Sequence, residues 1–378
     1  MDRSLSDFQL VSNTMRLCKS LEGVELECLD LLIEDSIEKF SGSLQIYDRS
    51  LPDHLRVAKT PMWIPMTCAT IEISRSITGV ILSDAETLEF LENIHLLYRL
   101  DDFVETAPER YGIQDIAVLK RKLLGCFDIF ESDRSNGHSG TSLPHDSPME
   151  ESTQMSFNTL DVLQQDVLDL IDWLHQPSVK EAHFYNQKWY LTELRAMLEA
   201  MIQQLVEQAG SGEEISVDER ISLRSWLHGT GAGSVGTKYQ FAFFACLISA
   251  RDGTACWQDA HQSYMARAFA HHVSTSWRIW NDLGGRNRDR EEGALTCVSL
   301  VDQEELEALA RVACFEAQCA ILAQREFAGT GSGRGLSKHS ADWYLLEFFR
   351  KAVQLSGEIY MSGDPTRSTA GEGASWGI

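Results

Sequence analysis

The feature that most constrains this chain is the spacing of its apolar residues, which recur at every third and fourth position over most of its length. Such spacing places apolar side chains on one face of an α-helix, whereas a half-buried strand needs strict alternation. No segment combines alternation with a hairpin turn. The pattern is clearest in ECLDLLIEDSIEKF (27–40), AETLEFLENIHLLYRLDDFVE (85–105), IAVLKRKLLGCFDIFE (116–131), LDVLQQDVLDLIDWLH (160–175), WYLTELRAMLEAMIQQLVEQ (189–208) and QEELEALARVACFEAQCAILAQ (303–324). The sequence therefore predicts an all-α protein with about ten helices.

Three stretches lack this spacing and divide the chain. The stretch 132–154 is rich in Ser, Gly and Pro, which predicts a flexible insertion between two helices. The stretch GTGSGRG (329–335) predicts a mobile loop of the kind that can close over a site. We expect a frayed or disordered tail over 366–378. Between an N-terminal segment (1–30) and this tail, we expect one helical domain over 31–365.

The charge and cysteine content exclude several classes of partner and compartment. The formal net charge of −23 argues against nucleic acid or an anionic membrane surface as a partner. An anionic small ligand would have to be attracted by bound cations. The nine cysteines include no CxxC pair, which is typical of reduced thiols in the cytosol. The first residues contain no apolar segment of a secretory signal, and the longest apolar run, 241–250, is too short to cross a bilayer. We therefore expect a cytoplasmic protein with no membrane insertion.

A first acidic cluster lies in the stretch YRLDDFVET (98–106). On a helix Asp101 and Glu105 share a face, and Asp102 lies one step round from Asp101. Most other residues of this helix are apolar, so the carboxylates are expected to lie close together on a largely buried element. Carboxylates packed in this way raise one another's pKa or need a cation, and their hard oxygens suit Mg²⁺. The alternative is a solvated acidic face, which an acidic chain also produces by chance.

A second polar cluster lies in WNDLGGRNRD (280–289). Asn281, Gly285 and Asp289 follow one another at steps of four, which forms a stripe along one side of a helix. The amide and carboxylate oxygens can bind a hard cation, and the glycine leaves room for a water molecule. Arg278 lies three residues before Asn281, where its planar fork could bind a phosphate. The alternative is an exposed end of an amphipathic helix with charges paired in water.

Together the two clusters resemble a known pair of motifs. RLDDFVE resembles the aspartate-rich DDxx(D/E) motif of class I terpene synthases, and NDLGGRNRD resembles their second motif, (N/D)Dxx(S/T/G)xxxE. The order of the motifs and the 180 residues from Asp101 to Asn281 match that family. The local sequence, NDLGxxxRDR followed by EGALTCVSL, is most similar to the class I, kaurene-synthase-like domain of fungal labdane-related diterpene synthases. Gly285 stands where that motif usually has Ser or Thr, and Asp289 where it usually has Glu.

The resemblance implies a fold and a reaction. The fold would be the class I terpenoid synthase helical bundle, the α domain, around a central active-site cavity. The reaction would be Mg²⁺-assisted loss of diphosphate from a prenyl diphosphate, followed by cyclisation of the carbocation to a terpene hydrocarbon or alcohol. Copalyl and geranylgeranyl diphosphate are the expected substrates, and three Mg²⁺ ions are expected. The implied metal ligands are Asp101, Asp102, Glu105, Asn281, Gly285 (through a water molecule) and Asp289. The catalytic residues would be Asp101, Asn281, Asp289 and Arg278.

The resemblance also implies residues that bind the substrate. Arg278 matches the diphosphate-binding arginine of the family, and Lys238 is a second candidate for a phosphate contact. The glycine-rich stretch 226–241 matches the place where the family interrupts a helix beside the cavity. The alternative is an ordinary loop between two helices, which would have the same composition. The remaining candidates are Tyr360 and Arg367, which would close over the diphosphate, and Trp277 and Phe241, which would line the pocket.

The neighbouring histidines His271 and His272 have no carboxylate at metal-ligand spacing in the sequence. We therefore expect them to pack in the core or to lie at the surface.

An absent motif narrows the reaction. The chain has no DxDD sequence, so it lacks the general acid with which class II cyclases begin by protonation. We expect a stand-alone or excised class I domain that takes a preformed prenyl diphosphate, with a class II cyclase as a supplier of substrate and a homodimer as a further partner. Three alternatives stay open: a sesquiterpene synthase that uses farnesyl diphosphate, a chain-elongating prenyltransferase, and a non-catalytic helical binding protein. The prenyltransferase ranks lower because its second motif would begin with Asp.

Overall fold

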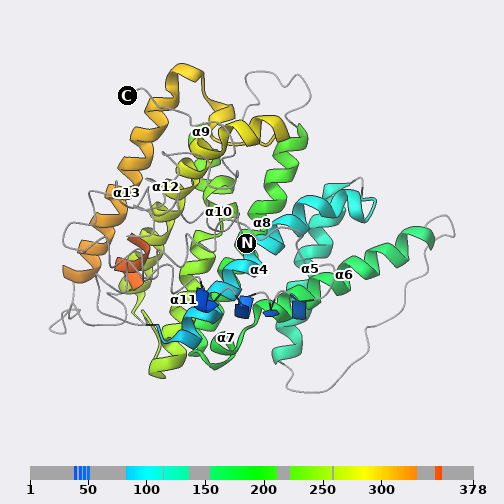
Figure 1. The fold of residues 1–378 in the computed structure, drawn as a ribbon, viewed down its shortest axis with the longest axis horizontal. Helices are drawn as coiled ribbons and strands as arrows, with labels where there is room; N and C mark the ends of the chain where they lie inside the picture. The colour runs from blue at the N-terminus through cyan, green and yellow to red at the C-terminus, as the bar shows by residue number, and fades with distance from the viewer. Residues whose placement is uncertain are drawn as a thin grey trace.

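The computed structural model describes most of the chain between residues 82 and 329, together with short pieces on either side. The described residues are 38–40, 42–44, 46–47, 49–51, 82–113, 115–135, 154–210, 222–257, 259–329 and 345–350. Every regular element in these ranges is a helix, which confirms the all-α fold class (Figure 1). The predicted N-terminal segment, the tail and most of the two predicted loops lie outside the described residues.

The described residues form a succession of helices. The α-helices are α4 (Asp84–Arg110), α5 (Ile116–Ser135), α6 (Gln154–Leu174), α7 (Pro177–Glu181), α8 (Phe184–Gly210), α9 (Leu223–Trp226), α10 (Ala232–Ser234), α11 (Thr237–Asp252), α12 (Ala260–Glu292) and α13 (Leu306–Gly329). A π-helical turn, η5 (Leu227–Gly231), joins α9 to α10, and two short 3₁₀ helices, η6 (Val298–Leu300) and η7 (Gln303–Glu305), precede α13. The helix α5 continues over 132–135, the first residues of the predicted insertion. No helix in the described part of the chain has the length and apolar character needed to span a membrane.

The helix α4 is the most enclosed long element and carries the first acidic cluster. It starts at a capping box, in which the backbone N–H of Glu86 donates to Ser83 Oγ and the N–H of Ser83 donates to the Glu86 carboxylate. Between Phe90 and Leu100 buried side chains lie on all sides of the helix, as expected for a helix packed within the protein. Its neighbours in the described structure include α5, α6, α8 and α11.

A buried chain of hydrogen bonds aligns α4 with α8 and α11. The carbonyl of Leu174 can only accept, so Tyr190 donates its hydroxyl proton there (2.7 Å) and accepts from Tyr239 (3.0 Å). Tyr239 in turn accepts from the Asn93 side-chain amide (2.8 Å). Because Asn93, Tyr190 and Tyr239 are completely buried, a shift of one helix along another would leave polar groups without partners.

Aromatic side chains fill the space around α11. Phe243 stacks on Phe90 of α4, and Phe244 stacks on Phe348 of the segment 345–350. The long helix α12 lies alongside α13, with one face covered by α10 and α11 (Figure 1). It begins at Asp259, whose carboxylate accepts from the first backbone N–H groups, and ends at Gly293 in the left-handed conformation.

The helix between Leu223 and Asp252 is interrupted rather than replaced by a loop. The α-helical pattern gives way to the π-helical turn η5, resumes briefly in α10 and stops again at Gly236, where φ is +75°. At Gly236 an added Cβ would lie 2.7 Å from a methyl group of Leu97 on α4. The glycine-rich stretch 226–241 therefore allows both a left-handed residue and a close approach to α4.

Replacing Gly236 by alanine should lower the free energy of unfolding by about 2 kcal/mol, because the new methyl group meets Leu97 and the residue must stay left-handed. Urea unfolding measures this change. Gly229→Ala is the matched control, since nothing lies within 4 Å of its Cβ position, and it should cost no stability. Equal stability of the two variants would contradict the role of this contact.

Candidate functional site

The first acidic cluster lies near the carboxyl end of α4, where the helix emerges from the core. Asp101 is half-buried, whereas Asp102 and Glu105 are exposed. Phe103 and Val104, between them, are buried. Packing around the Asp102 carboxyl raises its pKa, and the positive charge of Arg99 opposes that shift. The cluster thus stands at the boundary between the buried and exposed parts of α4.

The second cluster occupies the last three turns of α12. Asn281 is half-buried, and Gly285 and Asp289 are buried, the latter with 6% of its surface exposed. A carboxylate buried to this extent needs a positive or hydrogen-bonding partner. Arg278 supplies positive charge, since the carboxylate of Asp289 is among the groups that raise its pKa.

Arg278 itself is held from two sides. Its Nε lies 2.8 Å from Oδ1 of Asp282, and its guanidinium carbon lies 5.0 Å from the ring centre of Trp226 on α9. Burial is the largest influence and lowers the pKa of Arg278, but Asp282, Cys297 and Asp289 together outweigh it, so the pKa is raised. Asp282 is completely buried and also accepts from the backbone N–H of Cys297 (2.8 Å). These contacts set the direction of the arginine side chain.

Asp282 is a residue that the sequence analysis passed over. It is the second letter of the motif that begins at Asn281, and it lies four residues after Arg278, which is the spacing of an ion pair on a helix. That spacing was the available signal. The sequence could not show that both groups are buried.

The interrupted helix contacts both motif helices. Gly236 approaches Leu97, which lies one turn before Asp101 on α4. The hydroxyl of Ser274, two turns before Asn281 on α12, donates to the carbonyl of Ala232 on α10 (2.5 Å). The segments that carry the two clusters are therefore positioned against a common element.

The donor chemistry of both clusters fits Mg²⁺, although the described residues form no closed cage. Within the described ranges, no three or more His, Cys, Asp or Glu side chains are arranged to hold a metal ion. Mg²⁺ commonly takes only one or two protein carboxylates and completes its octahedron with water and phosphate oxygens. The half-buried oxygens of Asp101 and Asn281 and the buried carboxylate of Asp289 are of this type.

The other predicted substrate contacts fall in different surroundings. Lys238 is half-buried in the first turn of α11, near enough to His271 for its charge to lower the pKa of that imidazole. Trp277 is half-buried against the main core. The Phe241 ring is stacked on Trp257 and contacts three more aromatic rings, so core packing accounts for its burial. Its role in lining a pocket stays a prediction, and Tyr360 and Arg367 lie outside the described residues.

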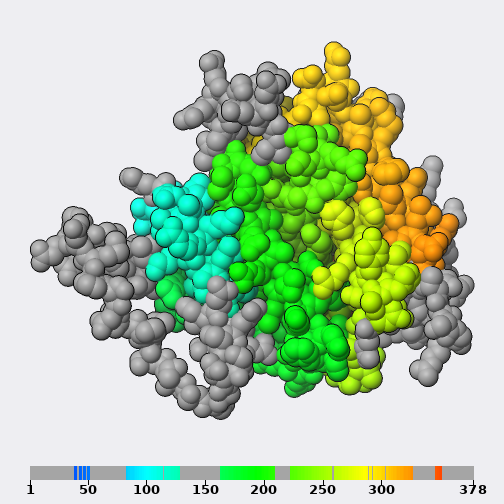
Figure 2. Space-filling model, turned by 180° about the vertical axis from the view of Figure 1, so that it is seen from behind, coloured from blue at the N-terminus to red at the C-terminus, as the bar shows by residue number. Residues whose placement is uncertain are grey.

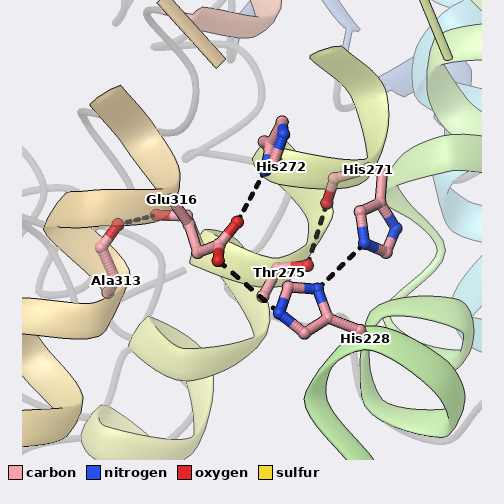
Figure 3. A network of polar contacts seen from close by, with 7 residues as sticks. His228, His271, His272, Thr275, Ala313 and Glu316 are labelled. Atoms are coloured by element: carbon pink, nitrogen blue, oxygen red, sulfur yellow. Dashed lines mark hydrogen bonds and ion pairs between the residues drawn. The ribbon is translucent and has the colours of Figure 1, made fainter. Parts of the chain in front are cut away.

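Of the neighbouring histidines His271 and His272, His272 lies beside a carboxylate that spacing in the sequence did not indicate. His272 Nδ1 lies 2.7 Å from the carboxylate of Glu316 on α13, and His271 Nε2 lies 3.0 Å from His228 Nδ1 on η5 (Figure 3). Glu316 is 44 residues from His272 in the chain. No local spacing could have indicated that contact.

Comparison with known proteins finds no matching family model, but it finds relatives among curated proteins. The chain is 29% identical over 174 residues to a pimaradiene synthase of Emericella nidulans, covering 44% of this chain and 17% of that protein. It is 29% identical over 212 residues to an ent-kaur-16-ene synthase of Phaeosphaeria sp., covering 52% of this chain and 22% of that protein. It is 24% identical over 297 residues to an ent-kaur-16-ene synthase of Fusarium fujikuroi, covering 72% of this chain and 30% of that protein.

These relatives are fungal diterpene synthases, and the resemblance predicted from the two motifs is confirmed at that level. The chain spans between 17% and 30% of the length of the three relatives.

The pairing of Arg278 with Asp282 gives a prediction about stability. Asp282→Ala should lower the free energy of unfolding by about 3 kcal/mol, because it leaves a buried guanidinium without its counter-charge. Urea unfolding checks this. Asp252→Ala is the control: its ion pair with Arg251 has the same 2.8 Å distance but is partly exposed, so we expect a change within about 0.5 kcal/mol. Similar losses for both variants would argue against the buried pair.

Proposed function

We propose that this chain is a class I diterpene synthase that cyclises a prenyl diphosphate, with copalyl or geranylgeranyl diphosphate as substrate and a cyclic hydrocarbon or alcohol as product. One observation carries the proposal. Two separated clusters of oxygen ligands lie on α4 and α12, and both helices contact the same interrupted helix, in a chain similar to fungal diterpene synthases. We propose further that the enzyme is cytoplasmic and depends on Mg²⁺.

The charge of the protein favours metal bridges between protein and substrate. A chain with a net charge of −23 repels a diphosphate unless cations lie between them. In this proposal the first motif, Asp101 with Asp102 and Glu105, and the second motif, Asn281 and Asp289 with a water molecule at Gly285, hold three Mg²⁺ ions. Bound Mg²⁺ stabilises the negative charge that develops on the leaving diphosphate.

Arg278 supplies a fixed positive charge beside the second motif. Its Nε faces Asp282 at 2.8 Å. In this proposal the outer nitrogens of the guanidinium bind the diphosphate. Because Asp282 and Trp226 already hold the side chain, little reorganisation is needed when a diphosphate arrives. Lys238, at the interruption, is proposed as a weaker phosphate contact.

The burial pattern along α4 indicates the direction of the hydrocarbon chain. Before Asp101 the buried side chains, among them Ile94, Leu97 and Leu100, lie on all sides of the helix. Beyond it one face stays buried, and Glu105 and Glu109 on the other face are exposed. An amphiphilic substrate whose diphosphate is held at Asp101 would direct its apolar chain toward the buried half of the helix. An allylic cation needs such a dry environment, since water would quench it.

Two alternatives are separated by experiment. A sesquiterpene synthase would use farnesyl diphosphate at the same two motifs and would differ in the depth of its pocket. A non-catalytic binding protein would bind Mg²⁺ and diphosphate without turnover. When copalyl diphosphate is the substrate, a class II cyclase would supply it, since this chain has no DxDD motif. A homodimer remains part of the proposal.

The decisive experiment is incubation of the purified chain with farnesyl, geranylgeranyl and copalyl diphosphates, each with and without Mg²⁺, followed by gas chromatography with mass spectrometry. We expect a cyclic C20 product that appears only with Mg²⁺. A C15 product alone would favour the sesquiterpene alternative. Binding of Mg²⁺ and diphosphate together in calorimetry, without any product, would favour the binding protein and contradict catalysis.

Alanine at Asp101 or Asn281 should reduce kcat at least about 10²-fold, because each removes an oxygen that holds the charge-stabilising ions. The melting temperature should be unchanged or raised, since a repelling or half-buried polar group is lost. Glu109→Ala, at an exposed position on the same helix, is the matched control and should retain full activity. Full activity of both motif variants would overturn the assignment of these residues.

A further inference from the structure

Four side chains from three elements meet where the π-helical turn η5 lies beside α12 and α13 (Figure 3). His228 belongs to the π-helical turn η5, His271 and His272 to α12, and Glu316 to α13. The Glu316 carboxylate lies 2.7 Å from His272 Nδ1 through one oxygen and 3.6 Å from His228 Nε2 through the other. His228 Nδ1 lies 3.0 Å from His271 Nε2. One carboxylate thus connects the turn η5 to both long helices.

The acceptor character of the carboxylate determines where the protons lie. Ionised Glu316 can only accept, so His272 carries a proton on Nδ1. The second oxygen lies 3.6 Å from His228 Nε2, and its negative charge favours the tautomer with the proton on that nitrogen. A neutral His228 then has a lone pair on Nδ1, so His271 must donate from Nε2. In this neutral arrangement every polar contact of the network joins a donor to an acceptor.

The network fastens a turn that needs external support. A π-helical turn is rare and usually lasts for a single turn within an α-helix. On its other side η5 is held by the Thr230 hydroxyl, which donates to Glu207 of α8 (3.1 Å). Glu316 is 3% exposed, and the side chains of His228 and His272 are 33% and 29% exposed. The network therefore lies where solvent protons can reach it, while its carboxylate stays buried.

Titratable groups surround His271 from each element packed against it. Lys238 faces it from α11, His228 from η5 and His272 from α12 itself, whereas Glu316 on α13 is the opposing carboxylate. Burial first, and then the charges of Lys238 and the two histidines, lower the pKa of His271 to about 4. Burial alone would raise the pKa of Glu316, but the histidines outweigh it and lower that pKa. Cys319, also on α13, has its own pKa raised by burial and by Glu316.

We propose that Glu316 and these three histidines form a proton-controlled clamp that holds the turn η5 against α12 and α13 at neutral pH and releases it in acid. Opening of the turn exposes His271 to water and returns its pKa from about 4 toward the ordinary 6.5. Between these two values the open form binds more protons than the closed form, so falling pH favours opening. Since α10, which follows η5 directly, is bonded to Ser274 of α12, release would loosen the interruption that both motif helices contact.

Hydrogen exchange tests the clamp without any substrate. Backbone amide exchange over 223–236 is followed in the full chain at pH 7 and pH 5 and corrected for the intrinsic rates. We expect the opening constant of η5 to rise about tenfold between these pH values. His271→Gln keeps a side-chain donor for His228 but cannot titrate, and its opening constant should change less than about twofold. Glu316→Gln should open more than the wild-type chain at pH 7, because the carboxylate that both histidines face is gone.

His261→Gln is the matched control, since His261 is an exposed histidine in the first turn of α12, and its pH dependence should equal that of the wild-type chain. If His271→Gln does not fold, His228→Asn replaces it with the same expected loss of pH dependence. An opening constant independent of pH in the wild-type chain, or an unchanged slope in the folded variant, overturns the proposal. The result does not depend on the proposed function, so failure of one leaves the other standing.

Discussion

The interruption between α9 and α11 is the constraint on which the described structure depends. In an uninterrupted helix from Leu223 to Asp252 the backbone N–H and C=O groups would bond to one another. Few of them would be available to neighbouring helices. Here the π-helical turn and the left-handed Gly236 free the backbone, and the carbonyl of Ala232 accepts a hydrogen bond from α12. The same region lets α4 come within contact distance at Leu97. The two segments that carry the acidic clusters are therefore positioned by one irregular element.

Charge in this protein is arranged in two different ways. At the surface it is abundant and negative, and it repels any anion that lacks a cation. Inside, it is sparse and paired: Arg278 with Asp282, and Glu316 with His272. Burial makes these pairs sensitive to the loss of either partner, which is why the arginine keeps its direction and the histidine network responds to protons. Both pairs adjoin the interrupted helix, Arg278 through Trp226 and Glu316 through His228.

Much of the helical framework was predictable from local spacing. The predicted stretches 85–105 and 189–208 lie within α4 and α8, because apolar residues at three and four describe a buried stripe whatever they pack against. The two motifs were also predictable, since each depends on steps of four along a single helix. Figure 2 shows how closely the described helices pack on the face opposite to that of Figure 1, and no local pattern predicts which of them meet. The network of Glu316 with His228, His271 and His272 was missed for that reason.

The sequence by itself determined the all-α class and the positions of most helices, and it supplied the candidate oxygen ligands, since these follow from periodicity and residue type within one element. Only the tertiary structure decided that the glycine-rich stretch is an interrupted helix, that Asp282 rather than solvent holds Arg278, and that a distant glutamate lies beside the histidines of α12. The physical reason is that burial and pairing depend on which helix faces which. Contacts between residues far apart in the chain fix that choice, and such contacts produce no repeating pattern in the sequence.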